Sequence, residues 1–216
     1  MEDLNLLISK KGTELLTSLI GQEFISMEHA KLKGRDIVFE KIEIASSNGR
    51  YLIDNRVDWF DDYFSGPEDM PFLDFKELNN DDDPFKTWSN DSTETQTIKE
   101  KIVNVVIVQD DCDVYKGDVF CQHIKSSEGI IIVTEKSQYS FFKDNMWLDE
   151  HVVIAKDENN VLSKAESLKE HYDIFGYPFN GKCQRSVISL KEGTIKVVET
   201  AEEVGEVAEE DQAAVQ

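Results

Sequence analysis

The feature that most constrains the fold of this chain is a series of short runs rich in β-branched residues. Three of them lie close together in the second half: Ile102–Val108, Val119–Ile124 and Ile130–Glu135. Val and Ile are enriched in strands, and runs of this length between turn residues are typical of strands in a sheet. Further strands are predicted at residues 23–27, 36–45, 50–54, 139–142 and 151–155, with a final hairpin over 186–200.

The turn between two of the first-half strands is the clearest local signal. The segment 39–44 alternates apolar and charged residues, and Ser46–Gly49 follows it with an Asn-Gly pair. Asn and Gly accept the positive φ angles that tight hairpin turns require. The sequence therefore predicts a β-hairpin centred on Ser46–Gly49.

Two helices are predicted beside these strands. Apolar residues recur at three- and four-residue steps from Leu4 to Leu19, which favours an N-terminal helix. A second helix is predicted over residues 163–175, because Ser163 and Glu166 have the spacing of a capping box. The expected fold class is thus α+β, mainly an antiparallel sheet with these two helices.

A polar segment at residues 79–97 predicts a division of the chain. We interpret it as an acidic linker or long loop between an N-terminal α+β unit, residues 1–78, and a C-terminal β-rich unit, residues 98–198. Residues 199–216 contain little that could enter a core and predict a disordered acidic tail.

The two halves share a short pattern. Ile44–Ile53 and Ile124–Val133 have Ile, Ser, Ser and Gly at matching positions, with a constant offset of 80 residues. An internal duplication would give two similar small units in tandem. Alternatively, Ser-Ser-x-Gly is an ordinary turn sequence that occurs twice by chance.

The negative charge of the chain is concentrated in two segments. The net charge is −21, and the segment from Asp61 to Glu94 contains eleven acids and two bases, while Glu199 to Gln216 contains seven acids and no base. Binding to nucleic acid through phosphate contacts, or to an anionic membrane surface, requires a basic surface and is therefore disfavoured. A basic protein partner remains compatible with this charge, as does a purely solubilising role.

Aromatic residues are also concentrated in the first acidic segment, eight of them between Trp59 and Trp88. On a helical turn, Trp59 and Tyr63 would share one face and the neighbouring acids would lie on the other. Aromatic anchors surrounded by acids suit a basic partner, although core packing of the rings is the alternative. The expected partner-binding residues are Trp59, Asp61, Asp62, Tyr63, Asp81, Asp82, Asp83, Phe85 and Trp88.

The sequence Asp111-Cys112-Asp113 after a β run is the one candidate for metal chemistry. Two carboxylates at the end of a strand could hold Mg²⁺ or Mn²⁺ for a transferase or hydrolase reaction. The segment fails as an EF-hand, because Lys116 stands where Gly is needed and Gln122 replaces the final Glu. The interpretation we favour is a long hairpin loop whose carboxylates are solvated.

The cysteine and histidine residues exclude several kinds of site and assign none. Cys121 and His123 share a strand face but do not make a zinc site, and the three cysteines are too few for a disulfide framework. A reducing cytoplasm without membrane association is expected. The sequence predicts a non-catalytic acidic interaction module that binds a basic protein, of the inhibitor or immunity type, with no cofactor. The alternative is a divalent-metal-dependent enzyme that uses Asp111 and Asp113.

Overall fold

The structure is a computed structural model, and it describes residues 3–31, 37–63, 66–86, 93–116, 118–143, 152–157, 161–172 and 180–204. The predicted α+β class is wrong, because this part of the chain is mostly antiparallel sheet with two short α-helices. The helices are α1 (Lys10–Ser18) and α2 (Leu168–His171), with a 3₁₀ turn η1 (Val161–Lys164). The strands are β1 (Leu4–Leu6), β2 (Glu23–Lys31), β3 (Ile37–Ser46), β4 (Gly49–Tyr63), β5 (Gly66–Leu78), β6 (Thr93–Lys116), β7 (Val119–Thr134), β8 (Gln138–Lys143), β9 (Val152–Asp157), β10 (Gly181–Ser189) and β11 (Thr194–Glu203).

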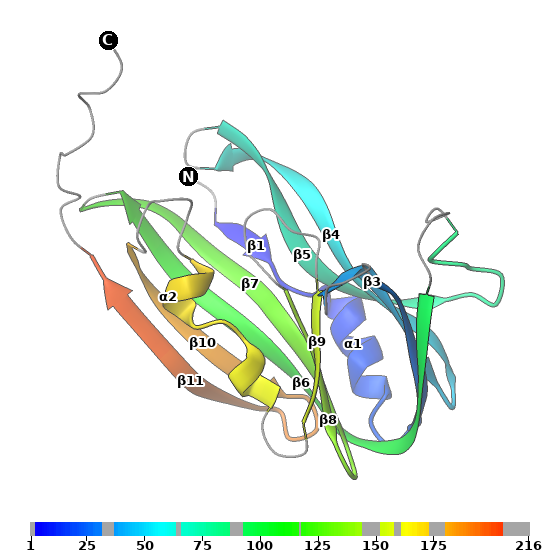
Figure 1. The fold of residues 1–216 in the computed structure, drawn as a ribbon. Helices are drawn as coiled ribbons and strands as arrows, with labels where there is room; N and C mark the ends of the chain where they lie inside the picture. The colour runs from blue at the N-terminus through cyan, green and yellow to red at the C-terminus, as the bar shows by residue number, and fades with distance from the viewer. Residues whose placement is uncertain are drawn as a thin grey trace.

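Six strands close into a ring, in the order β2, β3, β9, β8, β7, β6 and back to β2. The β4–β5 hairpin extends from β3, the β10–β11 hairpin extends from β6, and β1 pairs in parallel with β7 (Figure 1). The ring combines strands from both halves of the chain, because β2 pairs with β6 and β3 pairs with β9.

The longest strand, β6, connects these parts of the sheet. Its first nine residues pair with β2, and its second half lies between β7 and β10. The strand continues through Asp110–Asp113 to Lys116, so the hairpin loop predicted at Asp111 and Asp113 is wrong there. Side chains alternate along this stretch: Asp110, Cys112 and Val114 are buried, while Asp111 and Asp113 face the opposite side.

The turn at Ser46–Gly49 is confirmed as the hairpin between β3 and β4. Its counterpart in the second half, Ser126–Gly129, lies inside the continuous strand β7 and does not turn. The two matching sequences therefore have different local structures, and the predicted strands at 119–124 and 130–135 are one strand.

Both predicted helices are shorter than the sequence indicated. Leu4–Leu6 forms the strand β1, and α1 begins after Ser9, whose hydroxyl accepts a hydrogen bond from the backbone N–H of Gly12 at 3.0 Å. Near the other end of the chain, Ser167 and Glu170 form the capping box of α2 in place of the predicted pair at 163 and 166. The rest of that predicted helix, residues 173–175, lies outside the described residues.

Of the three apolar clusters in the described residues, the two largest lie on opposite faces of the sheet. The first lies inside the ring, where Leu16 and Leu19 of the α1 segment pack with residues such as Phe24, Phe75 and Tyr139. The second lies under α2, where Leu168 and Tyr172 pack against β1, β6, β7, β10 and β11. Figure 1 shows α2 lying across the face of the sheet that contains β10 and β11.

A disulfide between Cys112 and Cys183 joins β6 and β10 within this second cluster. The two cysteines are direct partners in the register of these strands, so the pairing that the sequence spacing did not indicate follows from the sheet. Residues 199–203, which were expected in the disordered tail, form the end of β11, and residues beyond 204 lie outside the description. Neither described helix has the length and apolar character needed to span a bilayer.

Candidate functional site

The acidic turn, which we define as residues 79–86, follows β5 and exposes Asp81, Asp82 and Asp83. Two of these carboxylates stabilise the turn itself. Asp82 accepts hydrogen bonds from the backbone N–H of Asn79 at 2.7 Å and from the Asn79 side-chain amide at 3.0 Å. Asp83 accepts one from the backbone N–H of Phe85 at 3.0 Å. Among the described contacts of the turn, the carboxylate of Asp81 has no such role.

Arg50 of β4 fixes the acidic turn to the sheet. Its Nε and Nη2 atoms donate to the two carboxylate oxygens of Glu43 at 2.7 Å each, which orients the guanidinium. The same guanidinium donates to the carbonyl oxygens of Asn79, Asn80 and Asp82 at 3.1–3.4 Å. The hydrogen bonds that Arg50 donates to the Glu43 carboxylate raise the pKa of Arg50. The three exposed acids are therefore presented on a backbone with a fixed conformation.

The structure describes the other expected partner-binding residues only in part. Trp59, Asp61, Asp62 and Tyr63 lie in β4 rather than on a helical turn, and their side chains are outside the described part of the chain. Phe85 is half-buried in the acidic turn, and Trp88 lies outside the described residues. The structure thus brings together Asp81, Asp82, Asp83 and Phe85.

The candidate metal pair, Asp111 and Asp113, lies on the outward face of β6 and contacts His123 of β7. The Nδ1 atom of His123 lies 2.7 Å from Asp113 Oδ1, and Nε2 lies 3.3 Å from Asp111 Oδ1. Lys125 also pairs with Asp111 at 3.3 Å. Because the two carboxylates contact opposite nitrogens of one ring, this arrangement does not bring them around a common ion, and the metal interpretation stays a prediction.

A shallow hollow of about 450 Å³ adjoins this pair on the outward face of β6, β10 and β11. Its polar lining consists of Asp111, Asp113, Lys182, Gln184, Thr200 and Glu202. Lys182 is already paired with Glu202 at 2.8 Å. The hollow is therefore a charged surface on which carboxylates outnumber the single lysine of its lining.

A row of polar residues crosses the buried face under α2. Ser126 of β7, Asp110 of β6, Arg185 of β10 and Glu199 of β11 are successive partners in the register of four neighbouring strands. Arg185 and Asp110 form a bidentate pair, with Nε to Oδ1 at 2.8 Å and Nη2 to Oδ2 at 2.7 Å. The Nη1 atom of Arg185 donates to the backbone carbonyl of Glu166, just before α2.

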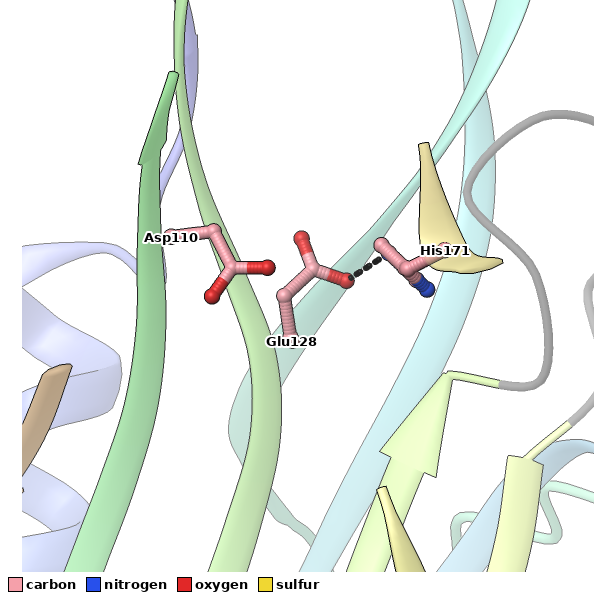
Figure 2. A group of neighbouring side chains, drawn as sticks. All are labelled: Asp110, Glu128 and His171. Carbon is pink, nitrogen blue, oxygen red and sulfur yellow. Dashed lines mark ion pairs between the residues drawn. The ribbon is translucent and has the colours of Figure 1, made fainter. Parts of the chain in front are cut away.

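Glu128 extends this row towards β8 and α2. It is the extra residue of a β-bulge, because Val108 pairs with Gly129 and Gln109 pairs with Ser127. A bulge redirects the side chain of the inserted residue. Glu128 Oε1 lies 3.0 Å from Lys143 Nζ, and Oε2 lies 2.7 Å from His171 Nε2. Figure 2 shows the Glu128 carboxylate between Asp110 and His171.

We call Asp110, Glu128, Lys143, His171 and Arg185 the buried ion network. Each of the five is at most 4% exposed. Burial raises the pKa of Asp110, and the paired guanidinium of Arg185 opposes that shift. Burial would also raise the pKa of Glu128, but Lys143 and His171 outweigh it and lower this pKa below its ordinary range. Burial would lower the pKa of His171, but Glu128 and Glu166 outweigh it and raise this pKa.

The buried ion network has the residue types of a metal site but not the free ligands. Asp110, Glu128 and His171 place ligand atoms within 4.8 Å of one another. However, both oxygens of Asp110 face the guanidinium of Arg185, and the two oxygens of Glu128 face Lys143 and His171. A divalent cation would have to displace positive groups that already neutralise these carboxylates. The geometry is that of paired charges.

The sequence interpretation missed this network entirely. The available signal was the alternation of Val108, Asp110, Cys112 and Val114, which continues the strand pattern and places Asp110 on the apolar face. No local signal identified Glu128, Lys143 or His171, because their neighbourhood arises from three different elements.

The chain matches no protein-family model, no curated protein and no solved structure. The functional interpretation therefore depends on the residues and geometry described above.

Proposed function

We propose that this protein is a non-catalytic acidic interaction module that binds and neutralises a basic protein. The observation that carries the proposal is the acidic turn, in which Arg50 fixes the backbone while Asp81, Asp82 and Asp83 stay exposed. A preformed acidic surface steers a basic partner and loses little conformational entropy on binding. The net charge of −21 favours the same class of partner.

The hydrogen bonds within the acidic turn distinguish the roles of the three acids. Asp82 and Asp83 accept hydrogen bonds that stabilise the turn. Among the described contacts the Asp81 carboxylate makes no such bond, and it is available to a binding partner. We therefore assign Asp81 as the main charged contact, and we assign Asp82 and Asp83 as residues that position it.

The buried ion network supports a non-catalytic role. Its carboxylates are paired with cations on the face covered by α2, and the described hollow lies on the other face of the sheet. Groups that are fully engaged with one another away from a cleft do not have the arrangement expected of an acid–base centre.

The cellular location is also a proposal. A cytoplasmic location would bring the protein into contact with basic intracellular partners. The Cys112–Cys183 disulfide weighs against this location, because disulfides are uncommon in a reducing compartment. The cytoplasmic location expected from the cysteine spacing therefore stays a prediction.

The test is a pull-down from host lysate with the full-length protein at low and high salt, followed by affinity measurement on the captured protein. We expect a basic partner whose affinity falls as salt rises, because exposed charges separated by more than a Debye length of about 10 Å at 0.1 M are screened. Asp81→Asn should weaken binding by roughly tenfold, with a lower association rate.

Glu135→Gln is the matched control. Glu135 is exposed, and its replacement removes the same charge at a different place on the surface. It should change affinity far less than Asp81→Asn. An affinity that does not depend on salt, or equal losses for the two variants, would contradict the proposal.

A further inference from the structure

Helix α2 is attached to the sheet by the apolar packing of Leu168 and Tyr172 and by a set of charged contacts. The Glu199 carboxylate of β11 accepts a hydrogen bond from the backbone N–H of Leu168 at 2.9 Å. Lys169 pairs with Glu203 at 2.7 Å, although both side chains are more than half exposed. The buried charged attachment is His171, which is 3% exposed and reaches Glu128 under the helix.

The disulfide lies beneath this helix. Leu168 and Tyr172 belong to the same packed cluster as Cys112 and Cys183, and the two cysteines are 0% and 4% exposed. Both cysteines are therefore shielded from a reductant in the folded state. Leu168 and Tyr172 contribute to this shielding together with Leu4 and Leu6 of β1, so local opening of α2 is one route of access and unfolding of the whole domain is another.

His171 makes contacts that favour its protonated form. Its Nε2 atom lies 2.7 Å from Glu128 Oε2, and its Nδ1 atom lies 3.4 Å from Glu166 Oε2. The protonated imidazolium carries a positive charge and is attracted to both carboxylates as an ion pair. The neutral ring lacks this attraction.

The other charged groups around the ring are Lys143 of β8, Asp110 of β6 and Arg185 of β10. Lys143 pairs with Glu128 and Arg185 pairs with Asp110, and neither pair includes a residue of α2. His171 is therefore the member of the network whose loss of charge releases an attachment of α2 specifically.

We propose that α2 is a pH-sensitive cover over the Cys112–Cys183 disulfide, held closed by protonated His171 between Glu128 and Glu166. Deprotonation of His171 removes its electrostatic attraction to both carboxylates. The cover then opens more often, and the disulfide becomes reducible in an otherwise folded protein. This inference goes beyond partner binding and does not depend on it.

The experiment measures the rate at which a water-soluble trialkylphosphine reduces the disulfide from about pH 6 to about pH 10. Phosphorus attacks one sulfur, the S–S bond breaks, and water hydrolyses the phosphonium, so that the phosphine becomes its oxide and the cysteines take up two protons as thiols. Alkylation and mass analysis of the peptides count the thiols. Each rate is divided by the rate for the urea-unfolded protein at the same pH.

For the wild-type protein, this ratio should rise by roughly tenfold or more across the range, since one unit of pKa shift corresponds to a factor of ten. His171→Gln should have a high ratio at every pH. Glu166→Gln removes only the partly exposed partner and should move the midpoint of the rise to lower pH.

His123→Gln is the matched control. His123 also lies between two carboxylates, but on the outward face of the sheet, so its replacement should leave the wild-type profile unchanged. A wild-type ratio that is constant with pH would overturn the proposal, as would a Glu166→Gln midpoint identical to that of the wild type. The Glu166→Gln result keeps the test decisive if His171→Gln fails to fold.

Discussion

The Arg185–Asp110 pair is the contact within the buried ion network whose disruption should cost the most stability. Arg185→Met leaves the Asp110 carboxylate buried without its partner, and we expect a loss of about 3–5 kcal/mol in the free energy of unfolding. The double replacement Asp110→Leu with Arg185→Met should recover most of that loss, because an apolar pair needs no charge compensation. Urea unfolding monitored by tryptophan fluorescence measures both.

Arg50→Met serves as the comparison, because the Arg50–Glu43 pair has the same bidentate geometry but its arginine side chain is 32% exposed. Its effect should be smaller, since exposed pairs contribute about 0–1 kcal/mol. Equal losses for the two arginine variants would contradict the view that burial gives the Asp110–Arg185 pair its importance.

The shifted pKa values of two residues in the buried ion network predict that the free energy of unfolding declines at both alkaline and acidic pH. His171 has a raised pKa in the folded state, so its contribution is complete below its ordinary value of 6.5 and is lost as the pH rises through the folded pKa. Glu128 has a lowered pKa, so its contribution is complete above its ordinary value of 4.5 and is lost as the pH falls. The urea midpoint should therefore be highest between about pH 4.5 and pH 6.5.

His171→Gln and Glu128→Gln separate the two declines in the same measurement. The first should remove the decline on the alkaline side, and the second should remove the decline on the acidic side, each at a cost in overall stability. A decline that persists unchanged in both variants would assign the pH dependence to other residues.

At the residue scale, the sequence predicted exposed acids better than buried ones. Asp81–Asp83 are exposed as their polar neighbourhood indicated, whereas Asp110 was assigned to a solvated loop and is fully buried. An acid followed by more acids usually indicates a turn. Here alternate acids of one strand face opposite sides of the sheet, and the arginine that compensates Asp110 is 75 residues away.

At the scale of single elements, the bulge in β7 is the feature that most depends on one residue. Gly129 follows the inserted Glu128, and a Cβ atom at this position would lie 2.2 Å from Phe142 Cδ1 and 3.2 Å from the Phe141 carbonyl oxygen. Gly129→Ala should therefore destabilise the protein by about 1–3 kcal/mol through overpacking. Thermal unfolding should show the loss as a lower melting temperature.

Gly49→Ala provides the control for this substitution. A Cβ at Gly49 would make only ordinary contact with Tyr51, its nearest atom being 3.7 Å away. The melting temperature of this variant should stay close to that of the wild type. If Gly129→Ala behaved in the same way, the bulge would not need the space that glycine leaves.

Strand positions in this protein were predictable from composition, but strand lengths were not. The segment predicted at 102–108 is part of β6, which continues far beyond its apolar run, and the two segments predicted at 119–124 and 130–135 are joined in β7 through the polar residues between them. Sheet pairing stabilises the polar portions, because their backbone groups hydrogen-bond to neighbouring strands. The helices were overestimated for the same reason: Leu4–Leu6 has helical spacing in the sequence but pairs with β7.

At the scale of the whole molecule, the strands of the two predicted units join one sheet. Residues 93–97, assigned to the linker, begin β6 and pair with β2. Ring closure through β3 and β9 requires contacts between segments more than 100 residues apart. Such pairings arise only when the chain folds, and no local pattern in a single sequence identifies them.

The row of partners that crosses the sheet under α2 has a consequence for how the chain reaches this structure. Asp110 faces Arg185, and Cys112 faces Cys183, in the same alignment of β6 and β10. If β10 slid by two residues in either direction, Asp110 would face Cys183 or Val187 and both charges would be buried without partners. The ion pair therefore disfavours misaligned pairings of β6 and β10, and the alignment that it favours is the one that places the two cysteines opposite each other.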